Sequence, residues 1–226
     1  MERPTLIILI TSLVVIGGGV ATYLVFSHKA VAPAPTQGTL NSQDLQGQAL
    51  FTDGEYGFSL RYPEKYETSF NFASYYHLPS YWRANALPEA TGTPILAIVG
   101  YRLQSEHSYP RYYDAEVRVS ASKDPKEVAR CEKAASEQGE KQLPDAVIGG
   151  TTFKVFSFQD AAAMQYVKGV SYRTVHEGAC VVLEQLATGS NYRDDPKSSE
   201  DISDDVLTSK YDALNAIIPT FAFAHP

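Results

Sequence analysis

A histidine and a cysteine lie four residues apart in the segment His176-Glu177-Gly178-Ala179-Cys180. A thiolate beside an imidazole is a nucleophile, because the imidazole can take up the thiol proton or stabilise the thiolate. Cys180 is therefore the candidate nucleophile of a cell-wall or thiol-redox enzyme. Glu177-Gly178 is typical of a tight turn, so strand alternation places His176 and Cys180 on opposite sides of a sheet. This geometry keeps catalysis by Cys180 as the alternative hypothesis.

The cysteine transpeptidases that process cell-wall peptide place Ser and Gly just before their Cys and an Arg soon after it. Here Ala179 precedes Cys180 and two valines follow. The chain has one other cysteine, Cys131, and an even pair in an exported domain indicates a disulfide. A closed loop of this length contributes about 4 kcal/mol in the chain-entropy treatment. Two buried free thiols are the alternative.

Aromatic side chains gather between residues 66 and 82 and form the best candidate for ligand binding. Such rings bury a large area and keep a polar handle, which suits glycan stacking or protein docking. The alternative is that they pack internally and close one end of a sheet. The candidate binding residues are Tyr75, Tyr76, Tyr81 and Trp82.

Metal and cofactor chemistry has little support. The five histidines are scattered, with no helical His pair and no Cys-x-x-Cys. The acidic run 193–205 lacks the alternating ligands and the central glycine of a calcium loop. No phosphate loop, dinucleotide fingerprint or Gly-x-Ser-x-Gly elbow is present. We therefore expect no metal and no cofactor, and the formal net charge of −7 argues against nucleic acid as a partner.

Residues 5–26 carry no charged side chain and are long enough, at about 1.5 Å per residue, to cross a bilayer core as a helix. The run is longer than the apolar region of a cleaved signal peptide, and the small-residue site at Ala30-Val31-Ala32 is followed by Pro33. We therefore expect an uncleaved signal-anchor. Flanking charges give almost no orientation. A short tail at 1–4 and a large C-terminal domain favour the extracytoplasmic side of the cell membrane.

The composition after the span changes twice. Residues 27–48 are rich in Ala, Pro and Thr and are expected to form a flexible stalk. Residues 49–226 are numerous enough for one domain with its own core. The chain is thus expected to be single-pass, with one exported domain.

Alternation and turn signals predict an antiparallel sheet. Hairpins are expected at Asp53-Gly54, Gly149-Gly150 and Glu177-Gly178, and residues 95–103 are apolar on both faces, which is typical of a covered central strand. Residues 115–121 alternate Ala and Val with Glu116, Arg118 and Ser120, which predicts a half-buried strand. In the third hairpin, Val175 is expected opposite Cys180.

Two helices are expected. The first begins at Asp124 as N-cap with Pro125 next, and its apolar stripe runs towards Gly139. The second begins near Ser203 and is stopped by Pro219, and a short strand is expected at 220–223. Its apolar stripe is expected to comprise Leu207, Tyr211, Leu214 and Ile218. The fold class is α+β, with about seven antiparallel strands flanked by two helices. A disulfide would require the first helix to pack on the sheet face that displays Cys180.

The FTD segment at 51–53 with YGFSLRYP at 56–63, the meandering sheet and the closing helix resemble the fold of PsbP-type photosystem extrinsic proteins and Mog-type Ran-binding proteins. The segments GGTTFKVFSFQDAAA (149–163), SYRTVHEGACVVLE (171–184) and IIPTFAF (217–223) resemble uncharacterised membrane-anchored bacterial proteins with such a domain. The resemblance implies a PsbP/Mog-like α/β/α sandwich, and no functional residue of those families maps onto this chain. We expect a binding or scaffolding domain for an envelope protein or glycan.

Overall fold

The computed structural model describes residues 39–41, 47–73, 81–87, 89–191 and 196–224, which belong to the compact unit Pro35–Pro226. No helix in this part of the chain is long and apolar enough to cross a membrane. The expected tail 1–4 and anchor 5–26 lie outside the described residues, so the anchor stays a prediction.

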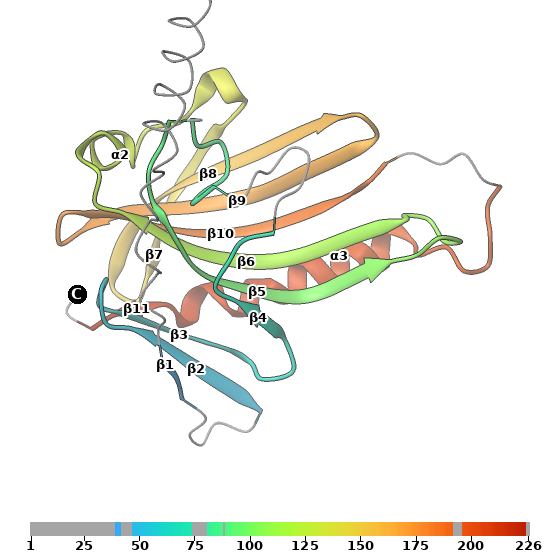
Figure 1. Cartoon of the computed structure of the whole chain (residues 1–226), viewed down its shortest axis with the longest axis horizontal. Coiled ribbons are helices and arrows are strands. Elements are labelled where there is room, and N and C mark those ends of the chain that lie inside the picture. Colours follow the sequence, from blue (N-terminus) through green and yellow to red (C-terminus); the bar gives the residue numbers. More distant parts are fainter. Residues whose placement is uncertain (1–38, 42–46, 74–80, 88, 192–195, 225–226) are drawn as a thin grey trace, which may run out of the picture. The chain divides into compact units, whose positions relative to one another are not determined.

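A seven-stranded antiparallel sheet dominates the described chain, in the order β4-β5-β6-β10-β9-β8-β7 (Figure 1). Its size agrees with the predicted sheet. Its strands are β4 (Glu67–Ser69), β5 (Thr93–Gln104), β6 (Tyr112–Ser122), β7 (Lys141–Ile148), β8 (Thr151–Ala162), β9 (Gln165–His176) and β10 (Ala179–Ser190).

A second, four-stranded sheet has the order β1-β2-β3-β11 and was not foreseen as a separate unit. Its strands are β1 (Thr39–Asn41), β2 (Gln48–Asp53), β3 (Phe58–Pro63) and β11 (Ala222–Phe223). The sequence predicts a stalk over 27–48, whereas β1 pairs with β2 through residues of that stretch. Pairing satisfies backbone groups that the edge of β2 would otherwise expose.

The hairpin between β2 and β3 forms where the sequence predicts it. The Asp53 carboxylate accepts hydrogen bonds from the backbone N–H groups of Glu55 and Tyr56, at 2.9 and 2.8 Å. Gly57 takes a positive φ of 65° at the end of the turn, which glycine adopts at low energy. Local side-chain chemistry therefore sets this turn.

The first helix, α2 (Pro125–Arg130), begins as predicted, because the Asp124 carboxylate accepts from the N–H groups of Lys126 and Glu127. The prediction that it runs towards Gly139 was wrong: it ends at Arg130, and only a 3₁₀ turn, η1 (Ser136–Gln138), follows. Further along, the Ala135 N–H donates to the carboxylate of Glu140, five residues on, at 2.7 Å and so does not continue a helix.

The last helix, α3 (Asp204–Asp212), has the expected N-cap, since Ser203 Oγ accepts from the N–H of Val206 at 3.4 Å. Beyond Asp212 the chain continues as the 3₁₀ turns η2 (Ala213–Ala216) and η3 (Ile218–Thr220). Leu207, Leu214 and Ile218 of the predicted apolar stripe are buried. The stripe was read correctly, although its end is not α-helical.

One face of the seven-stranded sheet, here called the apolar face, packs on α3, η2, η3 and the small sheet (Figure 1). The contacts form a single hydrophobic cluster. From the central strands it includes Leu96, Ile98, Val117, Val119 and Leu183, and from the opposite layer Phe51, Phe58, Leu60, Leu214 and Phe221.

The opposite face, here called the polar face, presents the alternate residues of the same strands. The prediction of a half-buried β6 was wrong, because Glu116, Arg118 and Ser120 are each only 1% exposed. Residues 72–73 lie against Arg118, Trp82 and Cys131 pack on Cys180 and Val182 of the same face, and Glu140 binds Arg173 there. Glu184 of β10 and Arg173 of β9 are fully buried on the same face.

The fold is therefore α+β, as predicted. The α/β/α layering holds in part: α3 lies on the apolar face, whereas the polar face is covered by a six-residue helix and irregular chain. Figure 1 shows α2 and α3 associated with different faces of the large sheet.

Candidate functional site

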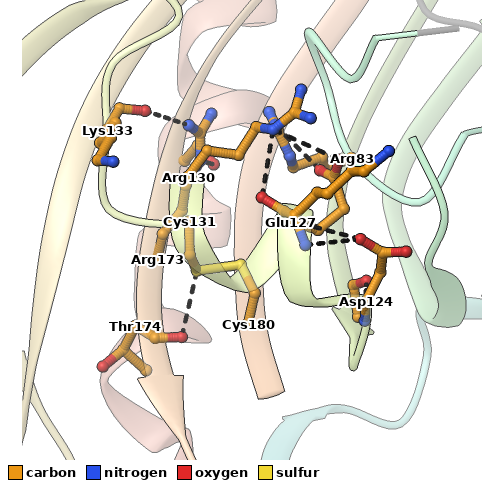
Figure 2. Close-up of a disulfide and its surroundings, with 12 residues drawn as sticks. Arg83, Asp124, Glu127, Arg130, Cys131, Lys133, Arg173, Thr174 and Cys180 are labelled. Carbon is orange, nitrogen blue, oxygen red and sulfur yellow. Dashed lines mark hydrogen bonds and ion pairs between the residues drawn. A yellow bond between two sulfur atoms is a disulfide. The ribbon is translucent and has the colours of Figure 1, made fainter. Parts of the chain in front are cut away.

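The Cys131–Cys180 pair forms a disulfide, with a Cα–Cα distance of 5.6 Å. Cys131 caps the end of α2 and Cys180 lies on β10 opposite Val175, as the predicted register requires. Figure 2 shows the bond joining the last turn of α2 to the polar face. The expectation that the first helix packs on the face displaying Cys180 is therefore confirmed.

The same bond bears on the alternative hypothesis of a Cys180 enzyme. Cys180 is fully buried and its sulfur is committed to Cys131. His176 lies on the apolar face, where its ring stacks on Phe223 with centroids 3.7 Å apart. The structure therefore does not bring the candidate nucleophile and its base together.

The aromatic candidates fall in different places. Tyr75 and Tyr76 lie outside the described residues, and Tyr81 is 37% exposed. Trp82 is buried among Cys131, Cys180 and Val182, which agrees with the packing alternative for this ring. A Cβ on Gly92 would lie 2.3 Å from the Trp82 ring, so only glycine leaves room for it. A binding role for the group stays a prediction.

The polar face carries a charged layer that the sequence did not reveal. Its members are Arg83, Glu116, Arg118, Glu127, Glu140, Arg173 and Glu184, all buried. Buried charges are unfavourable unless each is paired and hydrogen-bonded. The layer is therefore described through its partners.

Glu184 holds the segment that follows Trp82. Both of its carboxylate oxygens accept from the Ala84 N–H, at 3.0 and 3.2 Å, and Oε1 also accepts from Ser171 Oγ at 3.0 Å. Burial raises the pKa of Glu184, and the nearby Arg173 only partly offsets this. Both of these donors, the Ala84 N–H and the Ser171 hydroxyl, are neutral.

Arg173 extends the chain of contacts to the segment after α2. Its Nε donates to Ser171 Oγ at 2.9 Å, and its two terminal nitrogens bind the Glu140 carboxylate in a fork. Burial alone would raise the pKa of Glu140, but Arg173, the Ala135 N–H and the Asn85 amide together hold that pKa below its ordinary value. Glu140 thereby joins both covering segments to β9.

Arg118 forms the other fork, with Glu116, at 2.7 and 2.9 Å to Oε1. Its Nη2 also donates to the Ala73 carbonyl, and its guanidinium lies 4.6 Å from the centre of the Phe72 ring. Burial raises the pKa of Glu116, which the Arg118 charge counteracts. Arg118 thereby holds residues 72–73 against the polar face.

Arg83 is incompletely hydrogen-bonded. Its Nη1 donates to the carbonyls of Ala84 and Asn85, at 3.2 and 3.4 Å, whereas Nη2 lies 3.6 Å from Glu127 Oε2. Its Nε has no hydrogen-bond partner among the described residues. Burial, and next the charge of Arg173, lower the pKa of Arg83. Figure 2 shows Glu127 shared between Arg83 and Arg130.

An open pocket of about 400 Å³ lies between the two segments that the charged layer fixes. This is within the range of small-ligand sites. One wall is formed by Arg83, Asn85 and Leu87, and the other by Arg130 and residues 133–138. We take this pocket as the candidate functional site.

Sequence reasoning missed the pocket, although one signal was available. Glu184 interrupts the apolar run 179–187, and a charged residue inside such a run indicates a buried polar partner. The partners, Ala84 and Ser171, are 100 and 13 residues away, so no local pattern identifies them.

Metal chemistry has no support in the described part of the chain, where no group of three or more His, Cys, Asp and Glu side chains is placed to hold an ion. The acidic run has other roles where it is described. Asp201 accepts from the N–H groups of Tyr109 and Ser198, each at 3.0 Å, and Asp204 and Asp205 occupy the first turn of α3.

The architecture and pocket thus define an α+β domain with a small-ligand-sized cavity beside its disulfide. No protein-family profile matches the chain, and no curated protein matches it in sequence. Among solved structures it is similar to cyanobacterial PsbP (CyanoP) from Synechocystis sp. PCC 6803. That match has a TM-score of 0.38 and 10% identity, and covers 82% of this chain and 98% of that chain. The neighbour is of the PsbP type that the sequence resemblance named, and a likeness at this level carries no argument about function.

Proposed function

We propose that this chain is a membrane-anchored, extracytoplasmic binding or scaffolding protein that presents the domain 49–226 to an envelope protein or glycan. One observation carries the proposal. The pocket has walls from two segments far apart in sequence, and a disulfide and buried ion pairs hold both walls to the same sheet face. A preorganised site loses less entropy when a ligand binds.

The proposed location rests on two features. Residues 5–26 are uncharged and long enough to span a bilayer. A buried disulfide between residues 49 positions apart supports a compartment that allows oxidation. Protease added outside intact cells should digest the domain, whereas complete protection would contradict this topology.

Site-specific photo-crosslinking in the native envelope tests the binding role. A photoreactive residue replaces Gln138 at the pocket rim in the full chain, and a matched variant carries it at Lys168, an exposed position on β9 away from the pocket. We expect a discrete adduct from position 138 and none of the same mass from 168. No adduct at 138, or the same adduct from both, would contradict the proposal.

Thiol counting tests the alternative enzyme that uses Cys180. We expect no free thiol in the full chain denatured without reductant, since both cysteines are bonded. One reactive thiol of low pKa in the folded protein would favour the enzyme and argue against the disulfide.

A further inference from the structure

We propose that the pocket binds an oxyanion, the carboxylate or phosphate group of a larger ligand, with Arg130 and Lys133 at its rim and Arg83 behind them. The inference rests on the proposed binding function and names the chemistry of the ligand. Carboxylate and phosphate share the features that matter here, which are negative charge and several acceptor oxygens.

The charge of the lining is the first argument. Three cationic side chains line the pocket, Arg83, Arg130 and Lys133, against one acidic side chain, Glu137. The whole chain has a formal net charge of −7. A locally positive cavity in an acidic protein attracts anions to that place and repels them elsewhere.

The second argument is the incomplete neutralisation of Arg83. An arginine presents five N–H donors, and the Nε–Nη2 edge is the one that pairs with Ser171 and Glu140 in Arg173. In Arg83 that edge has the 3.6 Å contact with Glu127 and a buried Nε without a hydrogen-bond partner among the described residues, and the guanidinium lies 5.2 Å from the centre of the Trp82 ring. Arg83 therefore lines the pocket with a charge that no hydrogen-bonded ion pair neutralises.

Glu127 does not cancel this charge, because it is divided between two cations. Its Oε2 lies 3.6 Å from Arg83 and its Oε1 lies 3.7 Å from Arg130, both longer than a hydrogen bond. Arg130 also donates from Nε to the Lys126 carbonyl at 3.2 Å, which places it over the last turn of α2. Two arginines thus share one carboxylate (Figure 2).

The third argument is rigidity. Asn85 and Ala135 stand on opposite walls and both donate to Glu140, at 3.2 and 2.7 Å. Arg173 fixes Glu140 from the sheet, and the disulfide fixes the end of α2 next to Arg130. The walls that carry the cations therefore stand in place before a ligand arrives, which lowers the entropy cost of binding.

The test uses the full chain in non-ionic detergent, with amide NMR signals of the pocket residues followed during titration. The probes are inorganic phosphate and citrate, each against sodium chloride at equal ionic strength. We expect saturable shifts confined to the pocket with at least one probe. A phosphate response alone assigns a phosphorylated ligand, and a citrate response alone assigns a carboxylate ligand. No saturable shift with either overturns the proposal.

Charge removal supplies the control. The double variant Arg130→Gln/Lys133→Gln should weaken binding at least tenfold, since both side chains are on the rim and contribute little to the core. The matched variant Lys126→Gln/Lys197→Gln removes the same charge at exposed positions outside the lining, and should change affinity less than twofold. Equal loss of anion affinity in both variants would mean that the anion responds to the net charge of the protein and not to this pocket, and would overturn the site. Thermal unfolding of each variant verifies that the fold is retained.

The outcomes separate the two proposals. A crosslinked partner at position 138 that is retained in Arg130→Gln/Lys133→Gln would keep the binding function and overturn the oxyanion site. Saturable anion binding without any crosslinked partner would keep the site and contradict the partner-binding function.

Discussion

The two faces of the seven-stranded sheet are both buried, yet they are stabilised by different interactions. The apolar face packs aliphatic and aromatic side chains into one cluster. The polar face, formed by the alternate residues of the same strands, carries charges whose partners lie on the segments that cover it. Hydrophobic contacts are non-directional, whereas each ion-pair fork accepts one orientation.

The two faces therefore contribute differently to the folded protein. The apolar face supplies the burial that drives folding. The polar face fixes where residues 83–85 and 133–140 lie, and therefore where the pocket walls stand. A buried ion pair adds little net stability compared with apolar packing, so its contribution here is to orientation.

The largest effect should come from breaking one fork on the polar face. Arg173→Met should lower the free energy of unfolding by about 3–5 kcal/mol, because Glu140 would remain buried without its cation. Urea denaturation followed by the fluorescence of the single tryptophan, Trp82, measures this. Arg173→Met/Glu140→Gln should recover at least half of the loss. If the double variant is less stable than the single one, uncompensated charge is not the cause.

Methionine on the apolar face gives the matched contrast. Leu183→Met on β10 should lower the free energy of unfolding by less than about 1.5 kcal/mol, since volume is conserved. Leu183→Ala should lower it by about 3 kcal/mol through the cavity that it leaves. The same urea titration reports both. A loss from Leu183→Met as large as that from Arg173→Met would remove the distinction between the faces.

Two serine-to-alanine substitutions, one on the polar face and one at the N-terminus of α3, should have smaller effects on stability. Ser171→Ala removes the hydroxyl between Arg173 and Glu184 and should destabilise by about 2 kcal/mol, because buried donors and acceptors lose partners. Ser203→Ala removes only the N-cap of α3 and should destabilise by about 1 kcal/mol. Chemical denaturation of both variants in one buffer tests the order, and a larger effect at Ser203 would contradict it.

The smallest effect is a change in pH dependence. Burial raises the pKa of Glu184, so the folded state holds its proton more tightly than the unfolded state. The stability linked to this group is complete below the ordinary carboxyl pKa and is lost as pH rises through the raised value. Glu184→Gln keeps the shape of the side chain without the charge. The difference in the free energy of unfolding between this variant and the parent should therefore grow in favour of the variant as the pH rises from 4 to 8. Parallel stability curves over this range would mean that the pKa of Glu184 is not raised.

Local signals accounted for much of the fold. The turns at Asp53-Gly54 and Glu177-Gly178, the N-caps Asp124 and Ser203 and the pairing of Cys180 with Val175 follow from short-range patterns. Each depends on residues that are neighbours in sequence or across one hairpin. The disulfide followed from cysteine count and register together.

The candidate site did not follow, for a physical reason. Glu116 and Arg118 alternate with valines in the same way whether water or another segment covers them. Their cover comes from residues 72–73, whose pairing with β6 spans 45 positions. Glu140 likewise pairs with Arg173, which lies 33 positions further along the chain. Long-range partners of this kind leave no period in the sequence.

β1 has a mechanical consequence. The chain enters the small sheet through Thr39–Asn41, which pair with β2 alone among the described strands, as an antiparallel edge. A pull arriving from the N-terminal side therefore reaches this three-residue pairing before any other described strand. If the proposed anchor holds the chain, β1 would be the first described strand to release, before the charged layer and the disulfide on the other face of the large sheet are loaded.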